Sequence, residues 1–490
     1  MLGKKDPQGR FFDHYVYERH LPSDHELVRI HREVDFSFVE EETRDLYEEV
    51  MGRPSWPPEI LFRMLFLEFY SNLSDVQVAE QCLYNLLYRW FVGLKVGEGT
   101  PDDTTLVVFR KRLGQGRVER FFNKINEQAK SKGLLVGRHK MMDATHVIAN
   151  VAIPSTVGLL RQAREKVLRE IEKRYPVCAK RLEETYGKGD QQGRRATEEE
   201  LVKEVELTRE FFSEAKGKYT EGTDKVIEQM EGLLYGEEKI ASLVDPEARW
   251  GYKDEDHPFC GYKAHVGCDE SEIVTSLDLL SGNENEGAEK NVRSLLKKER
   301  EQGMEHEAVV ADALYDSAEN RKAIHEEKTA EEELVKAYIP SRHKEKKLDR
   351  FRYVKGKDQV ICPARQVSIG KSPHEQGHLY YFSVESCRDC PYREDCPPLN
   401  EGRVRVFVSE DHELKLLDEN PERKEALKKR PLIERRFGGA KKWHGLGRAR
   451  YWGKAKVAIQ ALMTFLVMNV KRIVKLLEIK VQKGGILQTG

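Results

Sequence analysis

Apolar residues in the first 135 positions recur at helical spacing, interrupted by capping signals. The run 59–70, EILFRMLFLEFY, is apolar almost all round, which predicts a helix at the centre of a core. Ser74 and Asp75 precede a second apolar-periodic run, 76–94, and are residue types that cap helices. The pattern predicts a succession of helices in this part of the chain.

A third start signal at 101–105, PDDTT, precedes a short helix predicted at 106–114. That helix carries consecutive basic residues, among them Arg110 and Arg112. A capped helix followed by a short basic helix is compatible with a DNA-reading helical module, although a plain helical bundle predicts the same pattern. We predict an all-α N-terminal DNA-binding domain over 1–135, in which Arg110 and Arg112 contact DNA.

The pattern then changes to that of an α/β domain. Five apolar strands are expected, together with one amphipathic helix at 286–303. The strands are 140–150, a hairpin of 262–268 and 273–280, 308–312, and 336–341. Strands with a hairpin, then a helix and further strands predict a mixed sheet. We assign the catalytic core to 136–154 and 241–344.

Two insertions interrupt this domain. The first, 155–240, is rich in charged residues and also has apolar residues at helical spacing. This pattern predicts an inserted helical hairpin with its loop at 187–195. The second, 345–415, lacks periodicity and holds half of the eight cysteines. Residues 416–490 then predict basic C-terminal helices that complete the core.

Composition narrows the class of protein. With 39% apolar and 34% charged residues in 490, a wholly disordered and a collagen-like chain are both excluded. The net charge is −1, yet 421–490 contains 18 Lys and Arg against 4 Asp and Glu. Such a basic segment favours a polyanionic partner; a solvated basic helix is the alternative.

Neither a membrane span nor a signal peptide is expected. The longest apolar run, Val457 to Val470, is too short for a bilayer and predicts a buried helix. The first residues lack the apolar core of a signal peptide. We therefore expect a cytoplasmic protein.

Two aspartates stand in or beside apolar strands. Asp143 lies within the strand 140–150, where a carboxylate is costly unless a cation balances it. Asp312 ends the strand AVVAD, and strand ends are where α/β sheets form sites. Asp316 and Ser317 precede a helical run and are interpreted as caps, so Asp312 receives the chemical role.

A third acid, Glu434, lies between two cations. Arg430, Glu434 and Lys441 are spaced 4 and 7 residues apart, within roughly 40° on a helix. A surface ion-pair ladder has the same spacing. Together with Asp143 and Asp312, however, Glu434 could bind two divalent ions, and oxygen ligands favour Mg²⁺ or Mn²⁺.

Four cysteines share the non-periodic insertion: Cys362, Cys387, Cys390 and Cys396. The spacing Cys387-x2-Cys390 is typical of a zinc knuckle, and four thiolates complete a tetrahedral structural zinc site. Reduced thiols in a packed subdomain are the alternative.

These residues belong to motifs that occur in a fixed order along most of the chain. They are GRPSWPP, PDDTTLVVFRKRL, MMDATHV, SLVDPEARWGYK, GYKAHVGCDE, VVADALYDSAENR and IERRFGGAKKWHGLGRARYWG. In them the sequence resembles an insertion-sequence DDE transposase of the type 1182 group, related to transposases with a Y-x2-R-x3-E-x6-K signature. The resemblance implies an RNase H-like core whose acids are Asp143, Asp312 and Glu434. Similar transposases often carry a Cys-rich insertion.

The resemblance also implies a function. The enzyme would bind terminal inverted repeats in double-stranded DNA, cleave the element ends and join them to target DNA, as a homodimer. Lys441, and Arg430 with it, would contact phosphates near the cut. A nuclease or recombinase that does not integrate, and a non-catalytic DNA-binding regulator, are the alternatives.

The chain departs from the family pattern at three positions. The signature tyrosine is replaced by Leu427, and the usual glycine before the tyrosine of the second motif is Leu314. Pro431 directly follows Arg430, which leaves the role of Arg430 open because proline starts or kinks a helix. None of these changes removes a carboxylate.

Overall fold

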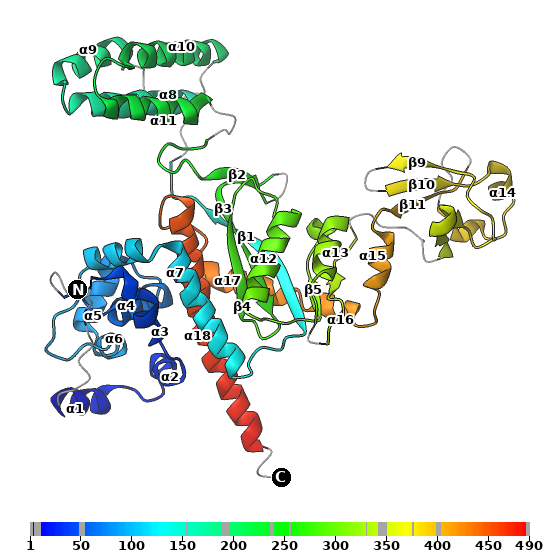
Figure 1. The fold of residues 1–490 in the computed structure, drawn as a ribbon, viewed down its shortest axis with the longest axis horizontal. Coiled ribbons are helices and arrows are strands. Elements are labelled where there is room, and N and C mark those ends of the chain that lie inside the picture. Colours follow the sequence, from blue (N-terminus) through cyan, green and yellow to red (C-terminus); the bar gives the residue numbers. More distant parts are fainter. Residues whose placement is uncertain are drawn as a thin grey trace.

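The protein, seen in a computed structural model, consists of a central body with two appended units (Figure 1). The structure describes residue 3 and residues 11–48, 54–152, 155–187, 197–235, 240–253, 256–329, 331–341, 350–374, 377–397 and 403–486.

A six-stranded mixed sheet forms the centre of the body. Its strands are β1 (His139–Ile148), β2 (Arg249–Tyr252), β3 (Pro258–Asp269), β4 (Val274–Ser281), β5 (Ala308–Val310) and β6 (Lys336–Tyr338). The order is β4-β3-β1-β5-β6, with β2 paired to the start of β3. β3 is antiparallel to β1 and β4, whereas β1, β5 and β6 run parallel. The predicted mixed sheet is therefore confirmed, although β5 ends two residues before Asp312.

Helices cover this sheet. They are α12 (Glu289–Glu301), α13 (Ala318–His325), α16 (Arg423–Lys428), α17 (Pro431–His444) and α18 (Lys454–Ile486). α12 packs against β4, and α17 packs against β1. α17 therefore lies beside the strand that holds Asp143.

In the described residues before the sheet, the structure has seven α-helices. They are α1 (Phe11–His20), α2 (Glu26–Glu33), α3 (Phe38–Thr43), α4 (Pro58–Tyr70), α5 (Asp75–Tyr84), α6 (Leu86–Val92) and α7 (Asp103–Ser131). α4 is buried from Pro58 to Phe69, which confirms the predicted central helix. The single helix expected at 76–94 is wrong, because Asn85 ends α5 and its side chain caps α6. Gly114, with a φ of 61°, ends the first part of α7, the short basic helix expected from the sequence.

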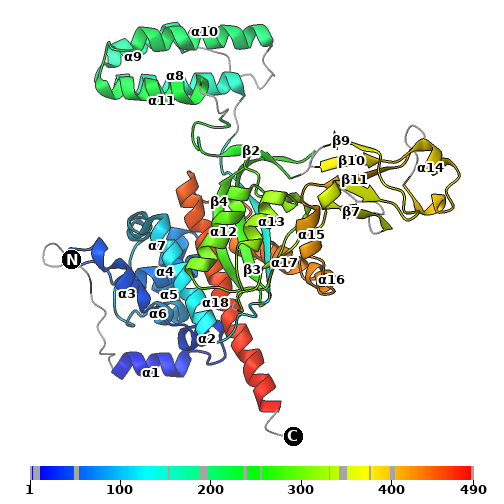
Figure 2. The ribbon, with the colours of Figure 1, turned by 45° about the vertical axis from the view of Figure 1, so that its right-hand side comes forward.

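The N-terminal helices and the sheet share one hydrophobic core. α18 packs against α7, α4 and α2 and also against β4, so the last helix of the chain joins the two (Figures 1 and 2). The expected division at residue 135 therefore separates sequence segments but not two cores. Lys454–Gln482 is long and apolar enough to span a membrane, but 89% of its most apolar window is buried, as in a core helix.

The first insertion is a four-helix unit instead of the predicted hairpin. It consists of α8 (Thr156–Glu172), α9 (Pro176–Tyr186), α10 (Glu198–Ala215) and α11 (Glu221–Tyr235), which pack around their own core. The unit stands away from the sheet in both ribbon views (Figures 1 and 2). Of the predicted loop at 187–195, residues 188–195 lie outside the described part of the chain.

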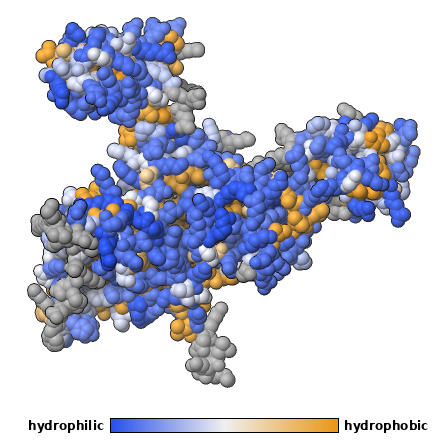
Figure 3. Space-filling model, viewed as in Figure 1, coloured by the Kyte–Doolittle hydropathy of each residue, from blue (hydrophilic) through white to orange (hydrophobic). Residues whose placement is uncertain are grey.

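The Cys-rich insertion is a small β unit. β9 (Gly370–His374), β10 (Gly377–Tyr381) and β11 (Arg405–Ser409) form one sheet, and β7 (Arg352–Val354) pairs with β8 (Gln359–Ile361). Its core contains eight buried residues. The face of the protein in Figure 3 is largely hydrophilic over both appended units, with apolar residues scattered among the polar ones.

Candidate functional site

Asp143 and Asp312 come from neighbouring parallel strands. β1 and β5 pair in register from His139 with Ala308 to Met141 with Val310, and each aspartate follows two residues after the last of these positions. The Asp312 carboxylate accepts a hydrogen bond of 2.8 Å from the Leu314 amide, which fixes the turn after β5. The sheet therefore positions both carboxylates at the same end of adjacent strands.

Glu434 approaches from α17, and Arg430 lies close to both Glu434 and Asp312. Arg430 is the residue before the helix, and Pro431 occupies its first position, where proline is tolerated. Arg430 Nη2 lies 3.3 Å from Glu434 Oε1 and 3.9 Å from Asp312 Oδ2. Pro431 therefore starts the helix without a kink, and the Arg430 guanidinium reaches two acids at once.

The pKa of Asp143 depends on the charges of the other two acids. Burial, together with the negative charges of Asp312 and Glu434, raises the pKa of Asp143 to about 7. The Arg430 guanidinium and the Ala144 amide, which donates to Asp143 at 2.8 Å, oppose this shift. The cluster thus carries excess negative charge that a bound cation would stabilise.

Two buried aromatic rings lie behind these acids. Tyr315 is fully buried, and burial followed by the charge of Asp143 raises the pKa of its hydroxyl well above the usual value. The ring of His265, from β3, stacks on Tyr315 at 5.8 Å between centroids, and burial lowers the pKa of His265 to about 3. A buried pair of rings therefore lies near Asp143. His265 carries no motif signal that the sequence analysis could have used.

Lys441 does not contact the acids. Its Nζ lies 3.3 Å from Nε2 and 3.4 Å from Nδ1 of His146 on β1. Glu434 and Lys441 share α17 as expected, but they face different positions along β1.

The two arginines expected to contact DNA lie in different surroundings. Arg110 is buried, with ion pairs to Asp75 and Glu68 and its guanidinium 4.6 Å above the Tyr451 ring. These contacts are those of a structural residue, and they leave Arg110 little surface for the predicted DNA contact. Apolar spacing alone would have placed position 110 on the buried side of the helix, since Leu106 lies four residues before it.

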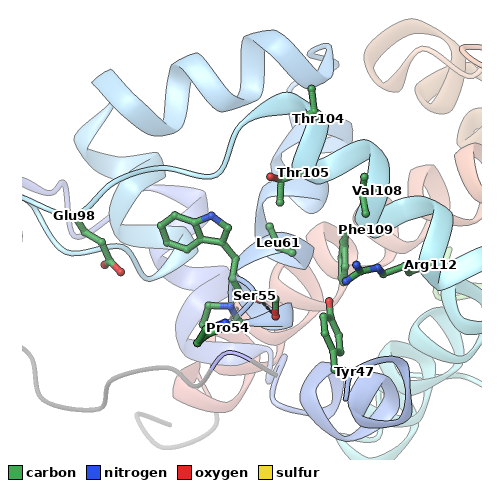
Figure 4. A pocket seen from close by; sticks show the side chains of 12 residues that line it. Tyr47, Pro54, Ser55, Leu61, Glu98, Thr104, Thr105, Val108, Phe109 and Arg112 are labelled. Atoms are coloured by element: carbon green, nitrogen blue, oxygen red, sulfur yellow. Dashed lines mark hydrogen bonds between the residues drawn. The ribbon is translucent and has the colours of Figure 1, made fainter. Parts of the chain in front are cut away.

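Arg112, in contrast, is exposed at a pocket of the N-terminal helices (Figure 4). The pocket has a volume of about 640 Å³, and Thr104, Val108 and Arg112 line it from successive turns of α7. The Arg112 guanidinium lies 5.4 Å from the centre of the Tyr47 ring. This face of α7 presents the Arg112 cation, the Thr104 hydroxyl and the Val108 methyl groups to the solvent.

Asp316 has the structural role that the sequence analysis gave it, but by different contacts. It is buried and pairs with Arg321 at 2.9 Å, while Ser317 alone caps α13. Arg321 also pairs with Asp418 and Asp411. Asp316 therefore belongs to a buried ion-pair network and not to the cluster of Asp143.

The four cysteines of the β unit line one small cavity. Cys362, Cys387, Cys390 and Cys396 surround it together with apolar side chains that include Phe351. Burial raises the pKa of the Cys396 thiol, and the other three cysteines raise it further. The Gln366 amide donates to Cys362 Sγ at 3.3 Å, which orients that sulfur.

In the described residues, neither the three acids nor the four thiols have the arrangement of metal ligands. Within the residues that the structure describes, no three His, Cys, Asp or Glu side chains are arranged to hold a metal. The acids and thiols fit divalent ions by donor type, hard oxygens in one case and soft sulfurs in the other. Binding would therefore require side-chain rotations, and at the acids also a shift of Arg430.

Two comparisons with known families match this chain. Residues 15–112, from α1 to the first part of α7, match the family described as transposase domain (DUF772). Residues 361–474, which include the four cysteines, α17 and most of α18, match the family described as transposase DDE domain. No solved structure matches the chain.

Proposed function

Because the chain is an insertion-sequence DDE transposase, a metal-dependent polynucleotidyl transferase with an RNase H-like core, we propose that Asp143, Asp312 and Glu434 are its catalytic acids. The observation that carries this proposal is their convergence around Arg430 from β1, the end of β5 and α17. The shared motifs further support membership of the type 1182 group. The DDE domain argues against the non-catalytic regulator.

The acids would hold two Mg²⁺ or Mn²⁺ ions. When bound, these ions supply an activated water or 3′-hydroxyl and stabilise the leaving oxygen of the phosphodiester. Asp143, the most buried acid, presents its carboxylate from a rigid strand, and the Tyr315 ring behind it excludes water. Arg430 compensates the negative charge of Asp312 and Glu434 and fixes the orientation of both. Lys441 contacts a DNA phosphate near the cut.

The exposed face of α7 is proposed to read the terminal inverted repeats. Arg112 and Lys111 supply cations on that face, while Thr104 and Val108 offer contacts of the kind that base edges and thymine methyl groups make. The protein is proposed to act in the cytoplasm as a homodimer, so that each copy engages one element end.

A structural zinc ion is proposed for the Cys-rich unit. Four thiols around one apolar cavity match a closed tetrahedral site. A core of eight buried residues is small for a unit of this size, so a metal would supply stability that apolar burial does not.

The catalytic proposal is tested with linear DNA that carries the element's own ends. Asp143→Asn, Asp312→Asn and Glu434→Gln should each reduce cleavage by at least a thousandfold, while repeat binding stays within about twofold, because each change removes a metal-binding charge but little volume. Glu425→Gln, an exposed acid on α16, is the matched control and should cleave normally. If any of the three variants cleaves at the wild-type rate, the residue that it replaces is not a catalytic acid.

The products distinguish a transposase from a nuclease on the same core. Supplying a supercoiled target plasmid should yield element ends joined covalently to the plasmid. Breaks without any joined product would show that this chain cleaves but does not integrate.

A further inference from the structure

Arg321, on α13, is a buried guanidinium that joins three aspartates from different parts of the chain. It is fully buried, and it pairs with Asp316 at 2.9 Å, with Asp411 at 3.3 Å and with Asp418. It also donates to two main-chain carbonyl oxygens at the end of β6, each at 3.1 Å. One side chain thus contacts the segment after β5, the end of β6 and the residues on either side of α15.

The first of these aspartates is tied to Asp312 by a single turn. The Tyr315 amide donates to the main-chain oxygen of Asp312, and the Asp316 amide donates to that of Ala313, both at 3.2 Å. The Asp312 carboxylate in turn accepts a hydrogen bond from the Leu314 amide. Residues 312 to 316 therefore form one hydrogen-bonded turn, and a shift of the Asp316 carboxylate would move the turn that carries Asp312.

The other two aspartates flank α15 (His412–Leu417). Asp411 directly precedes this helix, and Asp418 directly follows it. α15 packs against α13 and begins three residues after the end of β11, so the chain returns through it from the Cys-rich unit to the central body (Figure 1). Arg321 therefore connects the attachment of the Cys-rich unit to the turn after β5.

Geometry distinguishes this network from an apolar core. Its three carboxylates face Arg321 and also Lys415, which lies 2.9 Å from Asp411 and 3.5 Å from Asp316. Burying so many charges is costly, and apolar side chains of similar volume often stabilise a core at least as well. A guanidinium, however, has five donors in fixed planar directions, so it sets the relative positions of the groups that it contacts.

We propose that Arg321 is a positioning residue, which acts through Asp316 to hold Asp312 where it binds a divalent ion. The inference rests on the proposed function, because it takes Asp312 as a ligand of that ion. Groups that orient a metal ligand change the affinity for the metal without touching it. Ion binding at the acids therefore depends on how the Cys-rich unit is attached to the central body.

Calorimetric titration of the full-length protein with Mn²⁺ tests this role. Arg321→Lys keeps the charge but loses the planar set of donors, so Mn²⁺ should bind about tenfold more weakly, while repeat DNA binds within about twofold. A higher Mn²⁺ concentration should restore cleavage, because the ligands themselves are intact. Arg63→Lys is the matched control, since Arg63 is also buried and pairs with Glu59 at 2.7 Å, but within α4. It should unfold more easily and bind Mn²⁺ as the wild type does.

Two further variants test the two sides of Arg321. Asp316→Asn should weaken Mn²⁺ binding about tenfold. Asp418 lies on the far side, where it accepts hydrogen bonds from His325 and the Ala337 amide, and Asp418→Asn should weaken Mn²⁺ binding about threefold. When Arg321 is already Lys, Asp418→Asn should have no further effect, because its influence passes through Arg321. Both changes keep the side-chain volume, so they decide the question if Arg321→Lys does not fold.

The outcomes separate this inference from the proposed function. If Asp316→Asn and a folded Arg321→Lys unfold more easily but bind Mn²⁺ as the wild type does, Arg321 only stabilises the fold and the inference is wrong. Equally weak Mn²⁺ binding in Arg63→Lys would overturn it as well, because the effect would then follow from lost stability. If Asp312→Asn itself binds Mn²⁺ and cleaves as the wild type does, the proposed function fails instead.

Discussion

Arg110 and Asp75 form a two-pronged ion pair, with Nη1 2.8 Å from Oδ1 and Nη2 2.7 Å from Oδ2. The pair joins α7 to the start of α5 beneath the surface of the N-terminal helices. Two positions on one helix, 110 and 112, therefore have separable roles.

Replacing Arg110 with Ala should destabilise the protein by about 3 kcal/mol, because Asp75 loses its partner and the buried Glu68 keeps only Arg450 as a cation. Arg112→Ala should leave stability within about 0.5 kcal/mol and instead reduce the preference for repeat over random DNA. Denaturant unfolding and competitive binding measure the two effects. If Arg110→Ala folds stably and loses as much of the preference for repeat DNA as Arg112→Ala does, then Arg110 contacts DNA.

Removing the Arg430 charge should strengthen the binding of divalent ions at the acids. In Arg430→Gln, Asp312 and Glu434 lose a cation at 3.9 and 3.3 Å, so Mn²⁺ should bind about fivefold more tightly. Calorimetric titration with Mn²⁺ measures this, and Arg435→Gln, an exposed residue of the same helix, is the control. Weaker Mn²⁺ binding in Arg430→Gln would contradict the expectation that the Arg430 charge opposes ion binding at Asp312 and Glu434.

Purified protein should contain about one tightly held zinc ion per chain. Elemental analysis after dialysis measures it, and the double variant Cys387→Ser with Cys390→Ser should lose the metal, because two of four thiolates are gone. Cys178→Ser, in the four-helix unit, is the control and should retain it. Zinc that persists in the double variant would place the metal elsewhere.

Affinity for DNA should fall as the pH rises above about 8. The free Lys441 side chain has a lowered pKa of about 8, and a bound phosphate stabilises the charged form and raises that pKa. Above pH 8, binding must therefore take up a proton, and affinity should fall by up to about tenfold per unit. His146, with a pKa of about 4, stays neutral throughout this range.

Lys441→Arg provides the control for that titration, since arginine keeps its charge across the same range. Its affinity should be nearly independent of pH between about 7 and 9. If wild type and Lys441→Arg decline in parallel, another group is responsible for the pH dependence.

The sequence predicted the fold where local pattern and tertiary packing agree. β1, β3 and β4 alternate or run apolar as buried strands do, and α4 is apolar all round because other helices surround it. The small sheet of the Cys-rich unit was missed because its strands are short, and no residue of β9 is buried. The second helix pair of the first insertion was missed because the segment is so densely charged.

The candidate site was less accessible from sequence. Asp143, Asp312 and Glu434 stand out because acids beside apolar strands need a partner. His146 does not, since its proximity to Lys441 follows from the docking of α17 against β1. A one-dimensional pattern carries no information about that docking.

The position of α18 has a consequence for how the chain is made. α4 and α7, which emerge first from the ribosome, bury apolar surface against a helix that begins only at Lys454. The N-terminal helices therefore cannot complete their packing until almost the whole polypeptide has been synthesised. A message truncated before that helix should yield a product that exposes α4 and is degraded, so DNA recognition and chemistry appear together in each finished molecule.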